Sequence, residues 1–177
     1  MPRDPLENPK PLIRRVYAYV AYRIGDGPDA QDVTSETFAR ALRYRSSFDA
    51  KKGDQVAWLL GIARRCIADV QAVGAGEVEL FDRVAAPVEL ETQSIERLDL
   101  RRAVLALEPY ERELIALRYG ADLKARQIAE LLGARTNTVE VQLHRALDRL
   151  RTLLDEPEDE TRQHTAHERS RPRPKPS

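Results

Sequence analysis

Residues 123–154 constrain the fold of this chain more than any other stretch. Apolar side chains recur there at helical spacing in two runs, which Gly133 separates. Ala129, the glycine four residues later and Val139 six residues after that form the packing pattern of a helix-turn-helix. Glycine suits the turn because it tolerates a positive φ. The pattern therefore predicts a nucleic-acid-binding module, with an ordinary helical hairpin as the alternative.

Helical periodicity also accounts for most of the rest of the chain. No stretch alternates with the period of a β-strand, so the chain is predicted to be all-α. Amphipathic stripes predict further helices at residues 12–24, 30–45, 55–71, 95–107 and 109–119. The single cysteine, Cys66, lies on the third of these stripes, and we expect it to be a buried core thiol. Trp58 lies on the same stripe and is interpreted as a core anchor.

The apolar period is lost between the third and fourth stripes. Residues 73–94 carry five carboxylates against one arginine, together with two glycines and a proline. This composition is typical of a flexible acidic linker between two small helical domains. We therefore expect a loose tail at 1–11, a first domain at 12–72, the linker at 73–94, a helix-turn-helix domain at 95–154 and a disordered polar tail at 155–177.

Composition limits the classes of function. Acidic and basic side chains balance at 29 each, so no chain-wide positive charge predicts DNA binding. A lone cysteine excludes an intrachain disulfide. No apolar run approaches the length of a membrane span and no hydrophobic signal core opens the chain, which favours a cytoplasmic protein. Because no phosphate loop or catalytic grouping is visible, we expect neither an enzyme nor a bound cofactor or metal.

Three segments, in order, resemble one known family. DAQDVTSETFARAL at 29–42 and VAWLLGIARRCIADV at 56–70 are similar to domain 2 of bacterial sigma factors of the extracytoplasmic-function group, in the sigma-70 superfamily. Residues 107–151 resemble domain 4 of the same family. The resemblance implies a transcription initiation subunit that binds core RNA polymerase and promoter DNA. It also implies an anti-sigma factor as a partner, which such proteins commonly have.

The second helix of the helix-turn-helix presents a polar face opposite Val139. By resemblance, this helix reads the −35 promoter element, and its residue types suit base edges in a major groove and phosphates at the helix N-terminus. The candidate residues are Arg135, Thr136, Asn137, Thr138, Glu140, Val141, Gln142, His144 and Arg145. Many relatives carry cations where Glu140 and Gln142 stand, so we expect the isolated chain to bind DNA weakly.

The resemblance implies two further sites in the first domain. In the first of them, an acidic helix face is expected to contact the clamp coiled coil of the polymerase β′ subunit through Asp32, Ser35 and Glu36. The resemblance also implies that the second domain contacts the polymerase β flap. The loop at 46–54 and the next helix hold a flipped base and the single strand of the −10 element, a task that needs a ring and cations. The candidates for this site are Phe48, Lys51, Lys52, Arg64 and Arg65.

Two alternative functions remain open. A helix-turn-helix regulator that acts without polymerase would need a dimerisation element and a more basic recognition face, and we find neither in the sequence. A degenerate sigma-like interaction protein would bind polymerase or another partner and read no promoter. The acidic Glu140 and the lack of a basic stretch after residue 70 are compatible with that second alternative.

Overall fold

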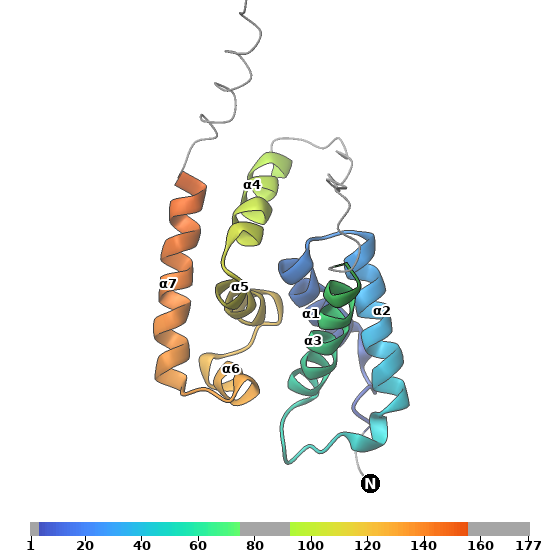
Figure 1. Ribbon diagram of the computed structural model, residues 1–177. Coiled ribbons are helices and arrows are strands. Elements are labelled where there is room, and N and C mark those ends of the chain that lie inside the picture. Colours follow the sequence, from blue (N-terminus) through green and yellow to red (C-terminus); the bar gives the residue numbers. More distant parts are fainter. Residues whose placement is uncertain (1–3, 75–92, 156–177) are drawn as a thin grey trace, which may run out of the picture.

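The computed structural model describes residues 4–74 and 93–155, and every regular element in them is helical (Figure 1). The elements are α1 (Pro9–Ile24), α2 (Pro28–Arg43), the short η1 (Arg45–Ser47), α3 (Gln55–Gly74), α4 (Gln93–Ala106), α5 (Pro109–Ile115), the π-helical turn η2 (Ala116–Gly120), α6 (Ala125–Leu132) and α7 (Thr136–Asp155). The all-α prediction is confirmed over these residues. The predicted linker and C-terminal tail lie almost entirely outside them.

The first helical unit consists of α1, α2 and α3. Proline begins both α1 and α2, at a position where its missing N–H would have no helical partner. The apolar stripes meet in a core in which Val20, Leu59 and Leu60 have no exposed surface. Cys66 is buried in this core, as predicted, and Trp58 packs half-buried against it. Helix α3 continues to Gly74, beyond the predicted end at residue 71.

The second helical unit consists of α4 to α7. Ala129 on α6 and Val139 on α7 are both buried, as the helix-turn-helix pattern requires. Gly133 between the two helices has a φ of 65°, in the left-handed region. The residue pattern that predicted the helix-turn-helix therefore corresponds to its packing and its turn.

Replacing Gly133 by alanine is expected to lower the free energy of unfolding by about 1 kcal/mol, because an L side chain is strained at positive φ. A Cβ at this position would meet nothing within 4 Å, so the cost comes from the backbone alone. Urea denaturation measures it. Gly61→Ala is the matched control, because a Cβ there also meets nothing within 4 Å but the glycine is helical. A loss above about 3 kcal/mol at Gly133 would contradict a purely conformational cost.

The helix predicted at 109–119 is α-helical only as far as Ile115. It then widens into a π turn, in which the N–H of Ala121 donates to the carbonyl of Ala116 at 2.9 Å. The wider turn seats Gly120 directly against the backbone of α1. A Cβ on Gly120 would lie 2.9 Å from the Cα and N of Tyr19. The local period could not reveal this departure, because it accompanies a contact with a distant helix.

The two helical units pack against each other. Helix α1 lies against η2 and α5, and the N-terminal part of α3 lies near α6 (Figure 1). One apolar cluster includes Val16 and Leu59 from the first unit together with Leu117 and Ile128 from the second. A second cluster joins α4, α5 and α7. The described residues therefore form one body, which the sequence analysis did not anticipate.

Candidate nucleic-acid interface

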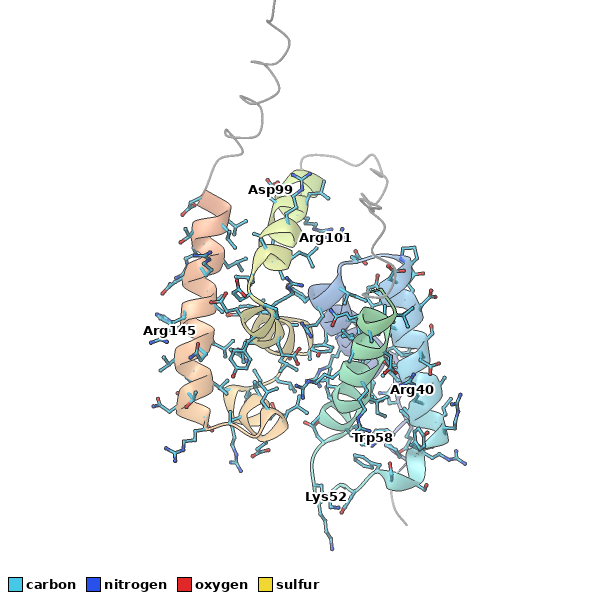
Figure 2. All side chains as sticks on the ribbon, viewed as in Figure 1. Arg40, Lys52, Trp58, Asp99, Arg101 and Arg145 are labelled. Carbon is cyan, nitrogen blue, oxygen red and sulfur yellow. The ribbon has the colours of Figure 1, made fainter. Side chains whose placement is uncertain are left out.

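The outer face of α7 carries the residues predicted to contact DNA at the −35 element. Arg135, just before the helix, and Asn137, Thr138, Glu140, Val141, His144 and Arg145 are exposed, whereas Thr136 and Gln142 are half-buried. Figure 2 shows Arg145 on the outer side of α7, away from the rest of the body. The opposite face of α7 buries Val139, Leu143 and Ala146. The structure therefore presents these predicted residues on one helix that is held by its apolar side.

One acidic residue on α7 is compensated within the helix. Asp148 accepts a hydrogen bond from Nη1 of Arg151 at 2.8 Å, and both side chains are exposed. An exposed pair of this kind contributes little to stability, but it reduces the field that Asp148 presents to DNA. Glu140 is a second exposed carboxylate on this helix.

The loop between α2 and α3 begins with η1 and ends at a helix cap. Asp54 accepts a hydrogen bond from the backbone N–H of Ala57 at 2.7 Å, which satisfies a free donor at the start of α3. The ring of Phe48 packs edge-to-face on Trp58, with 5.5 Å between centroids. Lys51 and Lys52 are exposed, and Figure 2 shows Lys52 at the tip of the loop. The two lysines are thus accessible to a phosphate backbone, whereas Phe48 is half-buried against Trp58.

A pocket of about 470 Å³ opens between α2 and α3 beside this loop. It is lined by Glu36, Arg40, Arg43, Tyr44, Ser47, Trp58, Ile62 and Arg65. Tyr44 is 55% exposed, so its ring is accessible to a stacking partner. An unstacked nucleotide needs an aromatic surface and nearby cations, and this pocket supplies both.

Sequence reasoning identified Arg65 but missed three other residues at this pocket. Arg40, Arg43 and Tyr44 lie at the C-terminal end of α2, where they resembled an ordinary polar helix surface. Only the packing of α2 on α3 brings them beside Arg65 and Trp58. The detectable signal was two arginines, Arg40 and Arg43, followed by Tyr44 just ahead of the predicted loop at 46–54.

Arg40 connects the predicted polymerase-binding face to the pocket. Its Nε donates to Glu36 at 2.6 Å and its Nη1 donates to Asp69 on α3 at 2.8 Å. These hydrogen bonds, first to Glu36 and then to Asp69, raise the pKa of Arg40. Asp32 and Ser35 lie exposed on α2, and Glu36 is half-buried. The three predicted polymerase contacts therefore share one helix face, with Glu36 held by Arg40.

Arg64 and Arg65 are adjacent in sequence but lie in different surroundings. Arg65 lines the pocket, whereas Nε of Arg64 pairs with Glu113 of α5 at 3.1 Å. The role of Arg64 at the −10 element stays a prediction. In the structure this side chain lies at the contact between the two helical units.

Glu113 is a buried carboxylate at the same contact, with 6% of its surface exposed. The Tyr19 hydroxyl lies 3.0 and 3.1 Å from its two oxygens, and Arg23 forms an ion pair with it. Burial, followed by the charge of Glu113, raises the pKa of Tyr19. The sequence analysis gave no role to Tyr19, Arg23 or Glu113.

Within residues 4–74 and 93–155, no three His, Cys, Asp or Glu side chains are placed to hold a metal ion. Among the described helices, none combines the length and apolarity that crossing a bilayer requires.

Comparison with known proteins identifies both helical units. The Sigma-70 region 2 family matches residues 10–71, and the Sigma-70 region 4 family matches residues 97–150. The ECF RNA polymerase sigma factor SigK of Mycobacterium ulcerans is 31% identical over 150 residues, which cover 80% of this chain and 80% of SigK. The chain belongs to the ECF RNA polymerase sigma factors. ECF here stands for extracytoplasmic function, and the family resemblance inferred from the sequence is confirmed.

Another ECF sigma factor, BldN of Streptomyces coelicolor, is 32% identical over 152 residues. That alignment covers 78% of this chain and 56% of BldN, so the match spans just over half of that relative's length. The sigma factor SigK of Mycobacterium tuberculosis is 31% identical over 150 residues, with 80% of each chain covered. The ECF assignment therefore rests on relatives from more than one genus.

Two solved structures share the fold. The sigma factor RpoE of Bartonella quintana, in complex with the anti-sigma factor NepR, has a TM-score of 0.69 at 22% identity and covers 81% of this chain and 91% of RpoE. CnrH, in complex with the cytosolic domain of CnrY, has a TM-score of 0.58 at 23% identity and covers 82% of this chain and 81% of CnrH. At these identities the likeness concerns the fold.

Proposed function

We propose that this ECF sigma factor binds core RNA polymerase and directs transcription initiation at promoters through their −10 and −35 elements. The observation that carries the proposal is that each sigma-family unit presents an exposed surface suited to nucleic acid. These surfaces are the outer face of α7 and the pocket between α2 and α3. In this role the chain is a subunit of a cytoplasmic transcription complex and performs no catalysis of its own.

At the −35 element, α7 enters the major groove. Arg145 and His144 contact base edges, while Arg135 and Thr138 contact phosphates beside the helix N-terminus. Exposure of these four side chains supports the assignment.

At the −10 element, the pocket between α2 and α3 takes a base that has left the duplex. Tyr44 supplies a stacking surface, Arg43 and Arg65 neutralise phosphates, and Lys51 and Lys52 guide the single strand. The volume of the pocket, about 470 Å³, and its lining support this role.

Polymerase contacts follow from the same geometry. The α2 face with Asp32, Ser35 and Glu36 meets the β′ clamp coiled coil, and the second unit meets the β flap. An anti-sigma factor is a further proposed partner, since RpoE and CnrH were both solved with proteins bound to them.

Replacing Tyr44 by leucine is expected to reduce initiation about fivefold, because a stacked base contributes about 1–3 kcal/mol and leucine retains part of the contact area. Affinity for core polymerase should stay unchanged. Abortive initiation assays at saturating sigma factor measure the effect. Leu42→Ala is the matched control, because Leu42 is 58% exposed near the end of α2, two residues before Tyr44, and does not line the pocket. Equal initiation by Tyr44→Leu and wild type would show that Tyr44 does not stack on a promoter base.

Run-off transcription with purified chain and core polymerase, on fragments of the source genome, tests the function as a whole. Specific start sites that depend on the chain support the sigma factor. Binding to core polymerase without any starts would favour the degenerate interaction protein. Binding to an operator in the absence of core polymerase would favour the independent regulator.

A further inference from the structure

The contact between the two helical units includes a buried anion beside the shared apolar cluster. Glu113 from α5 meets three side chains of the other unit, namely Tyr19 and Arg23 on α1 and Arg64 on α3. The side chains of Glu113 and Arg23 are 7% and 15% exposed, whereas that of Arg64 is 41% exposed. One carboxylate therefore gathers a hydroxyl and two guanidinium groups across the interface.

Further polar contacts surround this anion. Nε of Arg15 donates to the Ala121 carbonyl at 2.7 Å, and its Nη2 donates to the Asp122 carbonyl at 3.1 Å. At the other end of the interface, Gln127 donates to Asp54 at 2.9 Å. These bonds fix the register of the two units.

A buried ion network adds little net stability to a permanent contact between two units. Desolvation of its charges offsets most of their attraction, and well-packed apolar residues would hold the units equally well. Removal of one partner is nevertheless strongly unfavourable, because it leaves a buried charge without compensation. Such a network specifies one arrangement firmly, yet all its groups regain hydration when the units separate.

The packed arrangement cannot read both promoter elements at once. Figure 2 places Arg145 and Arg40 on opposite sides of the body. A compact body of this size is about 40 Å across. Elements centred about 25 base pairs apart are separated by about 85 Å along a duplex. Residues 75–92 join the two units, and a chain of that length reaches at most about 60 Å. The covalent chain therefore permits the units to move apart.

We propose that Glu113 is an internal latch that holds the free sigma factor in a closed, resting conformation. Opening breaks the hydrogen bond of Glu113 with Tyr19 and its ion pairs with Arg23 and Arg64. The surfaces for the −10 and −35 elements then move apart. Opening also exposes the Arg64 guanidinium for the promoter contact predicted for it. This inference rests on the proposed function.

The latch is tested by measuring the distance between the units in the full chain. Labels are attached at Ala68→Cys on α3 and Leu154→Cys on α7, two exposed positions, while the buried Cys66 stays out of reach of the reagent. Double electron–electron resonance or single-molecule energy transfer then reports closed and open populations. The wild type should show one short distance. Glu113→Gln should shift the ratio of closed to open at least about tenfold towards open.

Two further variants separate the latch from general damage. Tyr19→Phe removes only the hydroxyl and should shift the ratio in the same direction by a smaller factor, about threefold. Glu111→Gln removes a half-buried carboxylate on the same helix and should leave the distance unchanged. Far-ultraviolet circular dichroism should show full helicity in all three.

Addition of core polymerase completes the test. Saturating core should convert the wild type to the long distance, and Glu113→Gln should convert at a lower core concentration. A Glu113→Gln variant that stays closed, or a wild type that keeps the short distance on core polymerase while it initiates, would overturn the latch. In either case, specific run-off starts would still support the proposed sigma factor function. A chain that opens in Glu113→Gln but never initiates would instead support the latch and contradict the function.

Discussion

Replacing Gly120 by alanine is expected to separate the two helical units while each stays folded. The new Cβ would lie 2.9 Å from the Cα and N of Tyr19 and 3.0 Å from the carbonyl carbon of Ala18. These are backbone atoms of α1, so no rotamer change relieves the overlap. Overpacking of this kind costs about 1–3 kcal/mol, and separation of the units removes the overlap.

Small-angle X-ray scattering measures this outcome as an increase in the radius of gyration of the variant. Helicity measured by circular dichroism should stay at the wild-type value. Gly61→Ala is the control, because its Cβ meets no atom within 4 Å. Loss of helicity in Gly120→Ala, without expansion of a folded chain, would instead place the role of Gly120 inside the helix-turn-helix unit.

Replacing Arg145 by alanine is expected to lower promoter-specific initiation by about ten- to a hundredfold. Arg145 is exposed on the outer face of α7, and a bidentate contact of arginine with a base contributes about 1–3 kcal/mol of discrimination. Core polymerase affinity should change little, because that contact is assigned to other surfaces. Arg149→Ala is the control, since Arg149 is an exposed arginine on the same helix that is not among the residues assigned to the −35 element.

The measurement compares promoters with an intact and a scrambled −35 element. The loss in Arg145→Ala should disappear on the scrambled promoter, because there is then no specific contact to lose. A variant that loses core polymerase binding would show that α7 has been assigned to the wrong partner.

The sequence was sufficient to predict those parts of the structure that depend on residues close together in the chain. Ala129, Gly133 and Val139 predicted the helix-turn-helix because a small residue, a turn glycine and a buried β-branched residue act within one supersecondary unit. The apolar stripe of α7 likewise predicted which side chains face outwards. Periodicity alone therefore indicated the surface proposed for the −35 element.

Sequence was insufficient wherever distant residues meet. Tyr19 and Glu113 are 94 residues apart, and locally Glu113 is only one more charged residue on an amphipathic helix. The pocket beside Tyr44 likewise depends on how α2 packs against α3. No local pattern encodes either contact, so both the Glu113 contact and the pocket could be found only in the three-dimensional structure.

The π turn at Ala116–Gly120 has a consequence for how this segment tolerates change in length. A π turn carries one residue more than the α-helical turn from which it derives. Deleting one residue here would restore the α-helical repeat and rotate all that follows by about 100° relative to α5. The helix-turn-helix would then face a different direction, and Gly120 would no longer meet α1. Insertions and deletions in this stretch therefore change the orientation of both α6 and α7 relative to α5.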